Sequence, residues 1–319
     1  MKKSGIIILT FILSIGLYNC QKDNPPKDEE NPDYTIQDNL LINNNPAQLA
    51  SRITYKNEVV PIVETENSLA LKSTSEFPSI DLTKNYAFKL KAEVDPPVYE
   101  GNTLQATHVT IKDNYAFVTY NTRGPKWLGG VEIFDVSDLK NPKIISSAIL
   151  ANTDVSAVDY AGGKIYIVGA TGDFEEKGFV SPAFLEVISL DENMAFEKVD
   201  TIIDIPSFAG TDVKTAADQI FTTSGSTGEL GIFNSMYNKT GAKEISDARS
   251  VDANADFLYV LQGQEGRINV FNLPDATYNT TYYVGGANTP ESKSEIAASD
   301  EYIFAALNEG GLSILNLDG

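Results

Sequence analysis

The sequence has one cysteine, one histidine and one tryptophan among its 319 residues. One cysteine cannot form a disulfide within the chain, and one cysteine with one histidine is too small a ligand set for a zinc site. Basic residues are also few, because 24 Lys and Arg stand against 44 Asp and Glu, which gives a net charge of −20. No basic cluster is present to neutralise phosphates, so nucleic acid is excluded as a partner and the acidity indicates a solvated surface.

Motifs of common catalytic sites are absent as well. The chain has no GxGxxG, no GxxxxGK[ST] and no GxSxG motif. The stretch SGSTGELG at residues 224–231 is rich in glycine, but its place between two apolar runs indicates a turn. We therefore assign no catalytic residue from motifs.

The most apolar run lies at the N-terminus and is too short to span a membrane. Residues 5–17 follow Lys2 and Lys3 and are almost entirely apolar, which is the layout of a signal peptide. Their 13 residues fall short of the roughly 20 that a membrane-spanning helix requires. The sequence LYNC comes next and ends in the sole cysteine, Cys20. This stretch resembles the lipobox of bacterial lipoproteins, which implies lipidation of Cys20; the alternative is a stray cysteine in an ordinary signal peptide.

These features divide the chain into four parts. Residues 1–19 are expected to be the signal peptide, and residues 20–39 the lipidated cysteine with a flexible tether, because QKDNPPKDEENPD is rich in proline and charge. The acidic tract also resembles the export signal that sends lipoproteins to the outer face of the outer membrane. Residues 40–84 fit no repeat and are expected to form an accessory segment, whereas residues 85–319 form a repeat domain.

The repeat domain contains five related units. Each unit begins with an alternating run, a polar turn and a second run with an aromatic residue; these aromatics are Phe117, Tyr166, Phe221, Tyr259 and Phe304. Another alternating run follows, such as VEIFDVSD at residues 131–138 and INVFNLPD at residues 268–275. A third apolar run, such as KIISSAIL at residues 143–150, closes most units. Alternation with period two and many β-branched residues indicates strands that are half buried in a sheet.

Four short strands in each repeat predict an all-β protein, a β-propeller of four-stranded blades with five units visible. The stretch NYAFVTYN…GGVEIFDVSDLKNPKIISS resembles the LVIVD-type repeat, a propeller repeat of bacterial surface and secreted proteins, and the resemblance covers about residues 86–319. It implies the fold more than the function. Two closures are open: residues 85–94 supply the outermost strand of the fifth blade, or the sequence is cut short and further blades are missing.

Five equivalent residues are expected at the mouth of the central channel. The residue before the first apolar anchor of each inner strand is His108, Asp154, Asp212, Ser250 and Glu295. Carboxylates that converge there offer oxygen ligands for a cation such as Ca²⁺, although no metal site is assigned. The alternative is that these side chains accept local backbone hydrogen bonds at the strand starts. Their three carboxylates also resemble the catalytic set of five-bladed glycosidases.

A second candidate site lies in the loop between the second and third strands of the first unit. This loop, YNTRGPKWLGG at residues 120–130, holds the sole tryptophan, Trp127, beside Arg123 and Lys126. An aromatic ring flanked by cations can stack on a sugar or pair with an acidic partner. The alternative is that Trp127 covers the edge of a blade.

The sequence as a whole predicts a cell-envelope lipoprotein that is held to the membrane by its lipid. Its propeller is expected to serve as a non-catalytic platform for a protein or glycan ligand. The alternative function is a carbohydrate-active hydrolase with carboxylates at the channel mouth. The expected location is the outer membrane at the cell surface, with a periplasm-facing position as the alternative.

Overall fold

The computed structural model describes residues 34–61, 87–225, 227–263, 266–284, 293–307 and 311–317. The expected signal peptide and the expected lipidation site at Cys20 lie outside these residues. Over the described ranges, no helix combines the length and the apolar character needed to cross a membrane.

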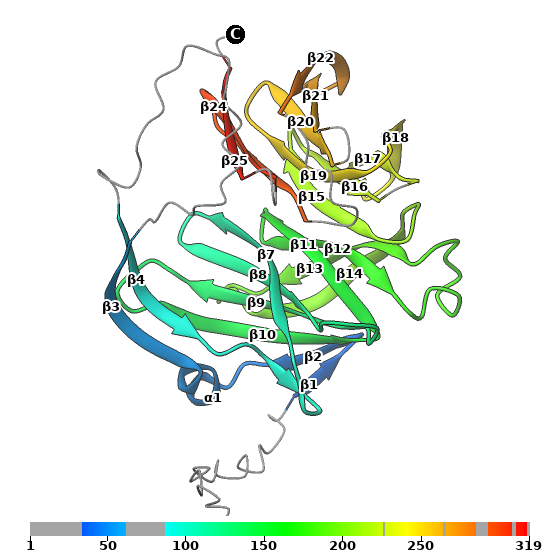
Figure 1. Cartoon of the computed structure of the whole chain (residues 1–319). Helices are drawn as coiled ribbons and strands as arrows, with labels where there is room; N and C mark the ends of the chain where they lie inside the picture. Colours follow the sequence, from blue (N-terminus) through cyan, green and yellow to red (C-terminus); the bar gives the residue numbers. More distant parts are fainter. Residues whose placement is uncertain are drawn as a thin grey trace, which may run out of the picture.

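Antiparallel sheets follow one another along the chain as the blades of a β-propeller, coloured from cyan to red in Figure 1. The first blade contains β7 (Gln105–Lys112), β8 (Tyr115–Asn121), β9 (Leu128–Asp135) and β10 (Lys143–Ala151). The second contains β11 (Thr153–Ala161), β12 (Lys164–Thr171), β13 (Ala183–Leu190) and β14 (Phe196–Asp204). The predicted fold class is confirmed.

The remaining blades repeat this pattern with shorter strands. The third contains β15 (Gly210–Ala216), β16 (Gln219–Ser224), β17 (Glu229–Asn234) and β18 (Lys239–Glu244). The fourth contains β19 (Ala248–Ala253), β20 (Phe257–Gln262), β21 (Arg267–Asn272) and β22 (Thr277–Tyr283). The fifth contains β23 (Glu295–Ala298), β24 (Tyr302–Ala306) and β25 (Leu312–Asn316), which are its three strands within the described part of the chain.

The polar turn of each unit forms the tight hairpin between the first two strands of a blade. In the second blade, Gly162 and Gly163 join β11 to β12 with φ of +60° and +77°. In the third blade, Ala217 and Asp218 hold the same positions with φ of +49° and +60°. Two successive residues with positive φ give a two-residue turn whose twist matches that of the flanking strands. These turns set the register of the inner strands that line the propeller axis.

Four of the five predicted aromatic residues, Phe117, Tyr166, Phe221 and Tyr259, are buried between neighbouring blades. Phe117 of the first blade stacks on Tyr160 of β11, with ring centroids 4.7 Å apart. Ile133, opposite Phe117 in the register, joins the same buried cluster with Val155 and Val158 of the second blade. The first blade therefore excludes water from the facing side of the second blade, as repeat architectures require.

The N-terminal segment extends the first blade. Strand β2 (Leu40–Asn43) pairs with β10, and β1 (Thr35–Gln37) pairs with β2, so this sheet has the order β1-β2-β10-β9-β8-β7. Helix α1 (Pro46–Ser51) follows and is capped by the Asn45 side chain, which accepts from the backbone N–H groups of Ala47 and Gln48. Strand β1 therefore lies inside residues 20–39, the range expected to be the tether.

The predicted closure by residues 85–94 is wrong for the residues that the structure describes. Strand β4 (Ala87–Val94) pairs with β3 (Ile53–Pro61) and not with the fifth blade. The physical reason lies at the base of this two-stranded ribbon. Ile53 and Val94 pack there against a buried cluster that contains Leu49 of α1 and Phe134 of β9. This contact directs β4 along the first blade. A short hairpin of β5 (Val98–Tyr99) and β6 (Asn102–Thr103) then leads into β7.

Candidate functional site

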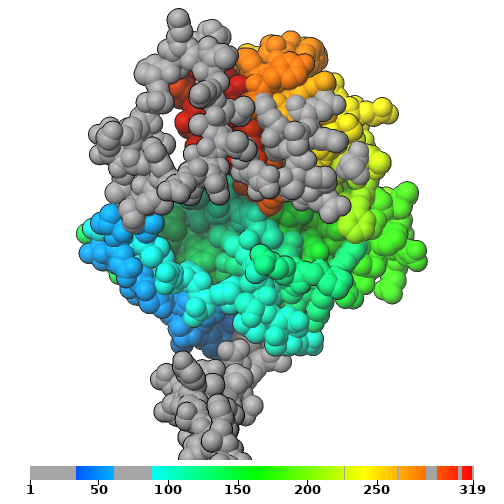
Figure 2. Space-filling model, in the orientation of Figure 1, coloured from blue at the N-terminus to red at the C-terminus, as the bar shows by residue number. Residues whose placement is uncertain are grey.

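A cavity of about 270 Å³ lies where the five inner strands converge. Figure 2 shows the molecule hollowed on this side, next to the cyan first blade. Five ionisable side chains besides the sole histidine, His108, line the cavity: Asp159, Asp212, Lys214, Asp252 and Glu295. Its other side is apolar and comes from β24, β25 and the valines of the inner strands. The cavity thus has a polar floor and an apolar wall.

The strand register defines which residues of the five blades are equivalent. In the first four blades, the pairing of the inner strand with the second strand shifts register at the same point. The shift lies just before His108, Ala157, Asp212 and Ser250. Each of these four residues pairs with the residue two places beyond the aromatic anchor of the second strand, and Glu295 of β23 pairs with Ala306 in the same way. Four of the five predicted ring residues are therefore equivalent. The second blade contributes Ala157, not Asp154, because the sequence alignment was displaced by three residues there.

Asp154 is not among the residues that line the cavity. Its Oδ1 accepts a hydrogen bond from the backbone N–H of Leu128 at 3.3 Å, and burial raises its pKa. The three carboxylates that resembled a glycosidase set are therefore not brought together: Asp212 and Glu295 line the cavity, and Asp154 does not.

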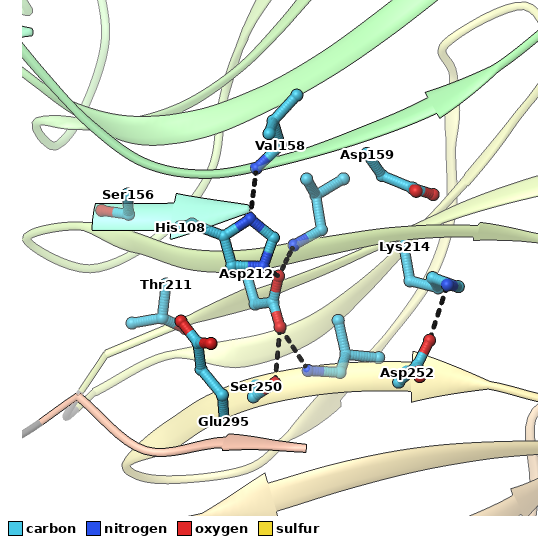
Figure 3. A network of polar contacts seen from close by, with 12 residues as sticks. His108, Ser156, Val158, Asp159, Thr211, Asp212, Lys214, Ser250, Asp252 and Glu295 are labelled. Atoms are coloured by element: carbon cyan, nitrogen blue, oxygen red, sulfur yellow. Dashed lines mark hydrogen bonds and ion pairs between the residues drawn. The ribbon is translucent and has the colours of Figure 1, made fainter. Parts of the chain in front are cut away.

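The ring residues connect one blade to the next (Figure 3). His108 Nδ1 accepts from the backbone N–H of Val158 at 3.4 Å. Asp212 Oδ2 accepts from the N–H of Val251 at 2.9 Å and from the Ser250 hydroxyl at 2.6 Å. Inner strands are sheet edges, and their inward N–H groups need partners when they are buried. The side chains supply those partners across the blade boundary, and Asp212 Oδ1 also accepts locally from the N–H of Val213 at 2.8 Å.

The residues two places further along the inner strands form a second ring, and its carboxylates also accept hydrogen bonds from the next blade. Asp159 Oδ2 accepts from the N–H and the hydroxyl of Thr215, at 2.7 and 2.6 Å. Asp252 Oδ2 accepts from the N–H of Ala298 at 2.7 Å. Between these carboxylates, Lys214 Nζ lies 2.6 Å from Asp252 Oδ1. Burial lowers the pKa of Lys214, but Asp252 and Asp159 outweigh it, so the pKa is raised and the ammonium stays charged.

Sequence reasoning missed Asp159, Lys214 and Asp252. Each lies directly opposite an aromatic anchor, since Asp159 pairs with Tyr166, Lys214 with Phe221 and Asp252 with Tyr259. The anchors were found from the sequence, so counting back across each hairpin would have found these residues as well.

The first ring holds the cavity's histidine and a buried acid, Asp212. His108 Nε2 lies 3.9 Å from Asp212 Oδ1. Burial raises the pKa of Asp212, and this effect is opposed by His108 and by the hydrogen bonds from Ser250 and Val251. Nδ1 of His108 accepts a hydrogen bond from the N–H of Val158, so a neutral ring with this acceptor carries its own proton on Nε2. The Nδ1 lone pair is then engaged within the protein.

Glu295 of the cavity lining pairs with Lys293, which precedes β23. Lys293 Nζ is 3.0 Å from Glu295 Oε1, donates to the carbonyl oxygen of Ser156 at 3.0 Å, and also contacts the carbonyl oxygen of Thr107. The ammonium therefore spans from the fifth blade to the first and second blades. Among the described residues, no group of three or more His, Cys, Asp or Glu side chains could hold a metal ion.

The predicted loop site lies away from this ring. Arg123 and Lys126 are exposed. Trp127 is half-buried, packs edge-to-face on Phe208 with centroids 5.7 Å apart, and lies 3.5 Å from the place that a Cβ on Gly172 would take. Loops of the first, second and third blades thus meet at Trp127. Its ring contacts other loops rather than standing free.

The fold and its axial cavity define the class of this protein as a β-propeller. No protein-family model and no curated protein sequence matches the chain. Solved structures with propeller-like folds do match the chain. A candidate 6-phosphogluconolactonase from Bacteroides fragilis is 13% identical over 73% of this chain and 74% of its own, with a TM-score of 0.51. A functionally unknown protein from Desulfotomaculum acetoxidans is 13% identical over 74% of each chain, with a TM-score of 0.50. At this identity the likeness shows the fold alone.

Proposed function

We propose that this protein is a cell-envelope lipoprotein of the LVIVD-repeat kind, and that its propeller binds a ligand without converting it. The lipobox-like LYNC sequence and the acidic tract after Cys20 support the envelope location and its cell-surface side. The blade repeat supports the propeller, and the axial cavity supports binding.

One observation carries the binding function: the polar groups of the cavity are already engaged in holding the blades. Asp212 accepts hydrogen bonds from Ser250, Val251 and the N–H of Val213. His108 uses Nδ1 for Val158, so this nitrogen is not free to abstract a proton. Groups fixed in this way make a rigid, preorganised wall that recognises a ligand well and supplies no free nucleophile.

The lining favours a neutral or cationic ligand over a phosphorylated one. Four carboxyl groups and one ammonium line the cavity, so an anion meets net repulsion. The volume of about 270 Å³ is at the low end for a ligand pocket and suits one sugar unit or one side chain. A neutral glycan end or a basic side chain of a protein is therefore the ligand class that we propose.

A panel of neutral, amino and phosphorylated sugars tests this function by calorimetry with the full chain, followed by analysis for released products. Binding of neutral or amino sugars without turnover is expected. Lys214→Met removes the central ammonium and should change the affinity, whereas Lys140→Met at an exposed position should not. Preferred binding of phosphorylated sugars would contradict the ligand class.

Hydrolysis is the second candidate, and the observation that favours it is the approach of His108 to Asp212 inside a cavity. Release of sugar, or opening of a sugar lactone, that is lost in Asp212→Asn would establish the hydrolase and overturn the binding function. Acylation is tested separately by labelling cells with a fatty-acid analogue. The wild type should incorporate the label and Cys20→Ala should not.

A further inference from the structure

One face of the fifth blade is apolar and exposed, although the same face is buried in the other blades. Phe304 is 38% exposed, and Ile314, opposite it in the register, is 54% exposed. Phe117 and Ile133 form the equivalent pair in the first blade and are both 0% exposed. Apolar pairs at the matching positions of the second, third and fourth blades are also buried: Tyr166 with Val187, Phe221 with Ile232, and Tyr259 with Val270.

The first blade shows the complementary half of this exposed junction. Val109 and Ile111 of β7 are 54% and 66% exposed. Residues that correspond to Val109 in the other blades are Val158, Val213, Val251 and Ile296, and all four are buried against the preceding blade. An interface that is dry at four blade boundaries is therefore open to solvent at the fifth.

Backbone groups at the same junction also lack the usual partners from the neighbouring blade. Ala297 holds the place of Asp159 and Asp252 in the fifth blade, and its methyl group cannot accept a hydrogen bond from β7. Within the described residues, β25 pairs with β24 alone, whereas β9, β13, β17 and β21 each have a fourth strand beside them. The fifth blade therefore offers both an apolar face and a sheet edge.

We propose that the junction formed by Val109, Ile111, Phe304, Leu312 and Ile314 is a docking site for an extended, positively charged strand of a partner protein with aliphatic side chains at alternate positions. The junction continues an interface that the protein makes four times, and at each of those boundaries the occupant is a strand with aliphatic residues. The net charge of −20 favours a basic partner and opposes a second copy of this chain. Strand addition at a sheet edge is an established way to bind a peptide.

This inference rests on the proposed binding function and names its partner class, and it concerns the apolar wall of the same cavity, to which Val109, Phe304 and Leu312 belong. Apolar contact and backbone pairing favour a peptide here. A sugar lacks both the aliphatic side chains and the amide groups that this junction would satisfy.

A labelled peptide with the sequence of β12, KIYIVGAT, is the probe, because its two isoleucines are buried at the boundary between the first and second blades. Fluorescence anisotropy with the full chain should show saturable binding. Ile314→Asn should weaken it by roughly tenfold or more, since a buried aliphatic contact is lost. Leu139→Asn is the matched control, because Leu139 is 68% exposed outside the junction. The peptide KNYNVGAT should bind to none of these proteins.

Three results would overturn the proposal. The first is an absence of peptide binding by the monomeric wild type, and the second is equal binding by the wild type and Ile314→Asn. The third is a wild-type dimer in sedimentation that Ile314→Asn converts to a monomer, which would make a second copy the occupant. A chain that binds sugars but fails these tests retains the proposed function and loses only this docking site.

Discussion

Replacement of Glu186 by glutamine is expected to make the protein more stable than the wild type above neutral pH. Glu186 lies on β13, is 1% exposed, and accepts a hydrogen bond at Oε2 from Asn39 Nδ2 at 3.1 Å. Glu186 Oε1 and Asn39 Oδ1 are both buried and have no hydrogen-bond partner among the described residues. A proton on Oε1 turns that atom into a donor, for which Asn39 Oδ1 is an available acceptor.

The sign of the effect follows from the direction of the pKa shift. Burial raises the pKa of Glu186 from 4.5 to about 7, opposed by Asn39 and Lys177 and assisted by Asp38. The folded state then holds this proton more tightly than the unfolded state. Its stabilising effect is complete below about pH 4.5 and is lost as the pH rises to about 7. A shift of about 2.5 units corresponds to about 3 kcal/mol.

Urea unfolding of the wild type and Glu186→Gln between about pH 4.5 and pH 8 measures the contribution of Glu186 to the free energy of unfolding. Glutamine keeps the shape of the neutral acid and can both accept from and donate to the Asn39 amide. The free energy of unfolding of the variant, relative to the wild type, should rise by about 3 kcal/mol across this range. Glu175→Gln, at an exposed position of the same blade, should follow the wild type. Parallel pH profiles for Glu186→Gln and the wild type would refute the reasoning.

Other variants test the packing of the blades and loops, and those at Phe117, Phe304 and Arg52 are read as free energies of unfolding from urea denaturation. Phe117→Ala should cost about 3–5 kcal/mol, whereas Phe304→Ala, at the equivalent but exposed position, should cost much less; equal losses would contradict the exposed junction. Arg52→Met should cost about 3 kcal/mol or more because it leaves the buried Glu132 carboxylate unpaired, and a second change, Glu132→Gln, should restore part of the loss. Trp127→Ala should lower the melting temperature if its ring chiefly joins the loops, whereas unchanged melting with lost sugar binding would favour recognition.

The repeated strands and their aromatic residues could be predicted from the sequence because both are local patterns. Phe117 and Tyr259 stand in alternating runs next to polar turns, and the structure buries both between blades. The fourth strand of the third blade, β18, could not be found in this way, because its sequence KTGAKE has no alternation of apolar residues. It forms a strand only because it pairs with β17, and that pairing is not visible in the local sequence.

The errors at the site arose where local sequence admits two registers. TDVSAVDY contains Val155 and Val158 three residues apart, and either valine can serve as the apolar anchor. An irregularity in the pairing after Val155 makes Val158 the structural equivalent of Val109. Such an irregularity depends on the partner strand, so Asp154 looked like a ring residue and Asp159 did not. The pairing of Arg52 with Glu132 joins residues 80 apart and has no local pattern.

The imidazole and carboxylate acceptors of the inner strands all serve the blade that follows them in the chain. In four consecutive boundaries an earlier blade supplies the acceptor, from His108, Asp159, Asp212 and Asp252, for a backbone N–H of the blade that follows. During synthesis, each blade therefore folds against a preceding blade that already carries the acceptors for its backbone N–H groups. Removal of C-terminal blades should leave these hydrogen bonds intact in the blades that remain. Deletion of the first blade, in contrast, would remove His108 and leave the N–H of Val158 in the second blade without its acceptor.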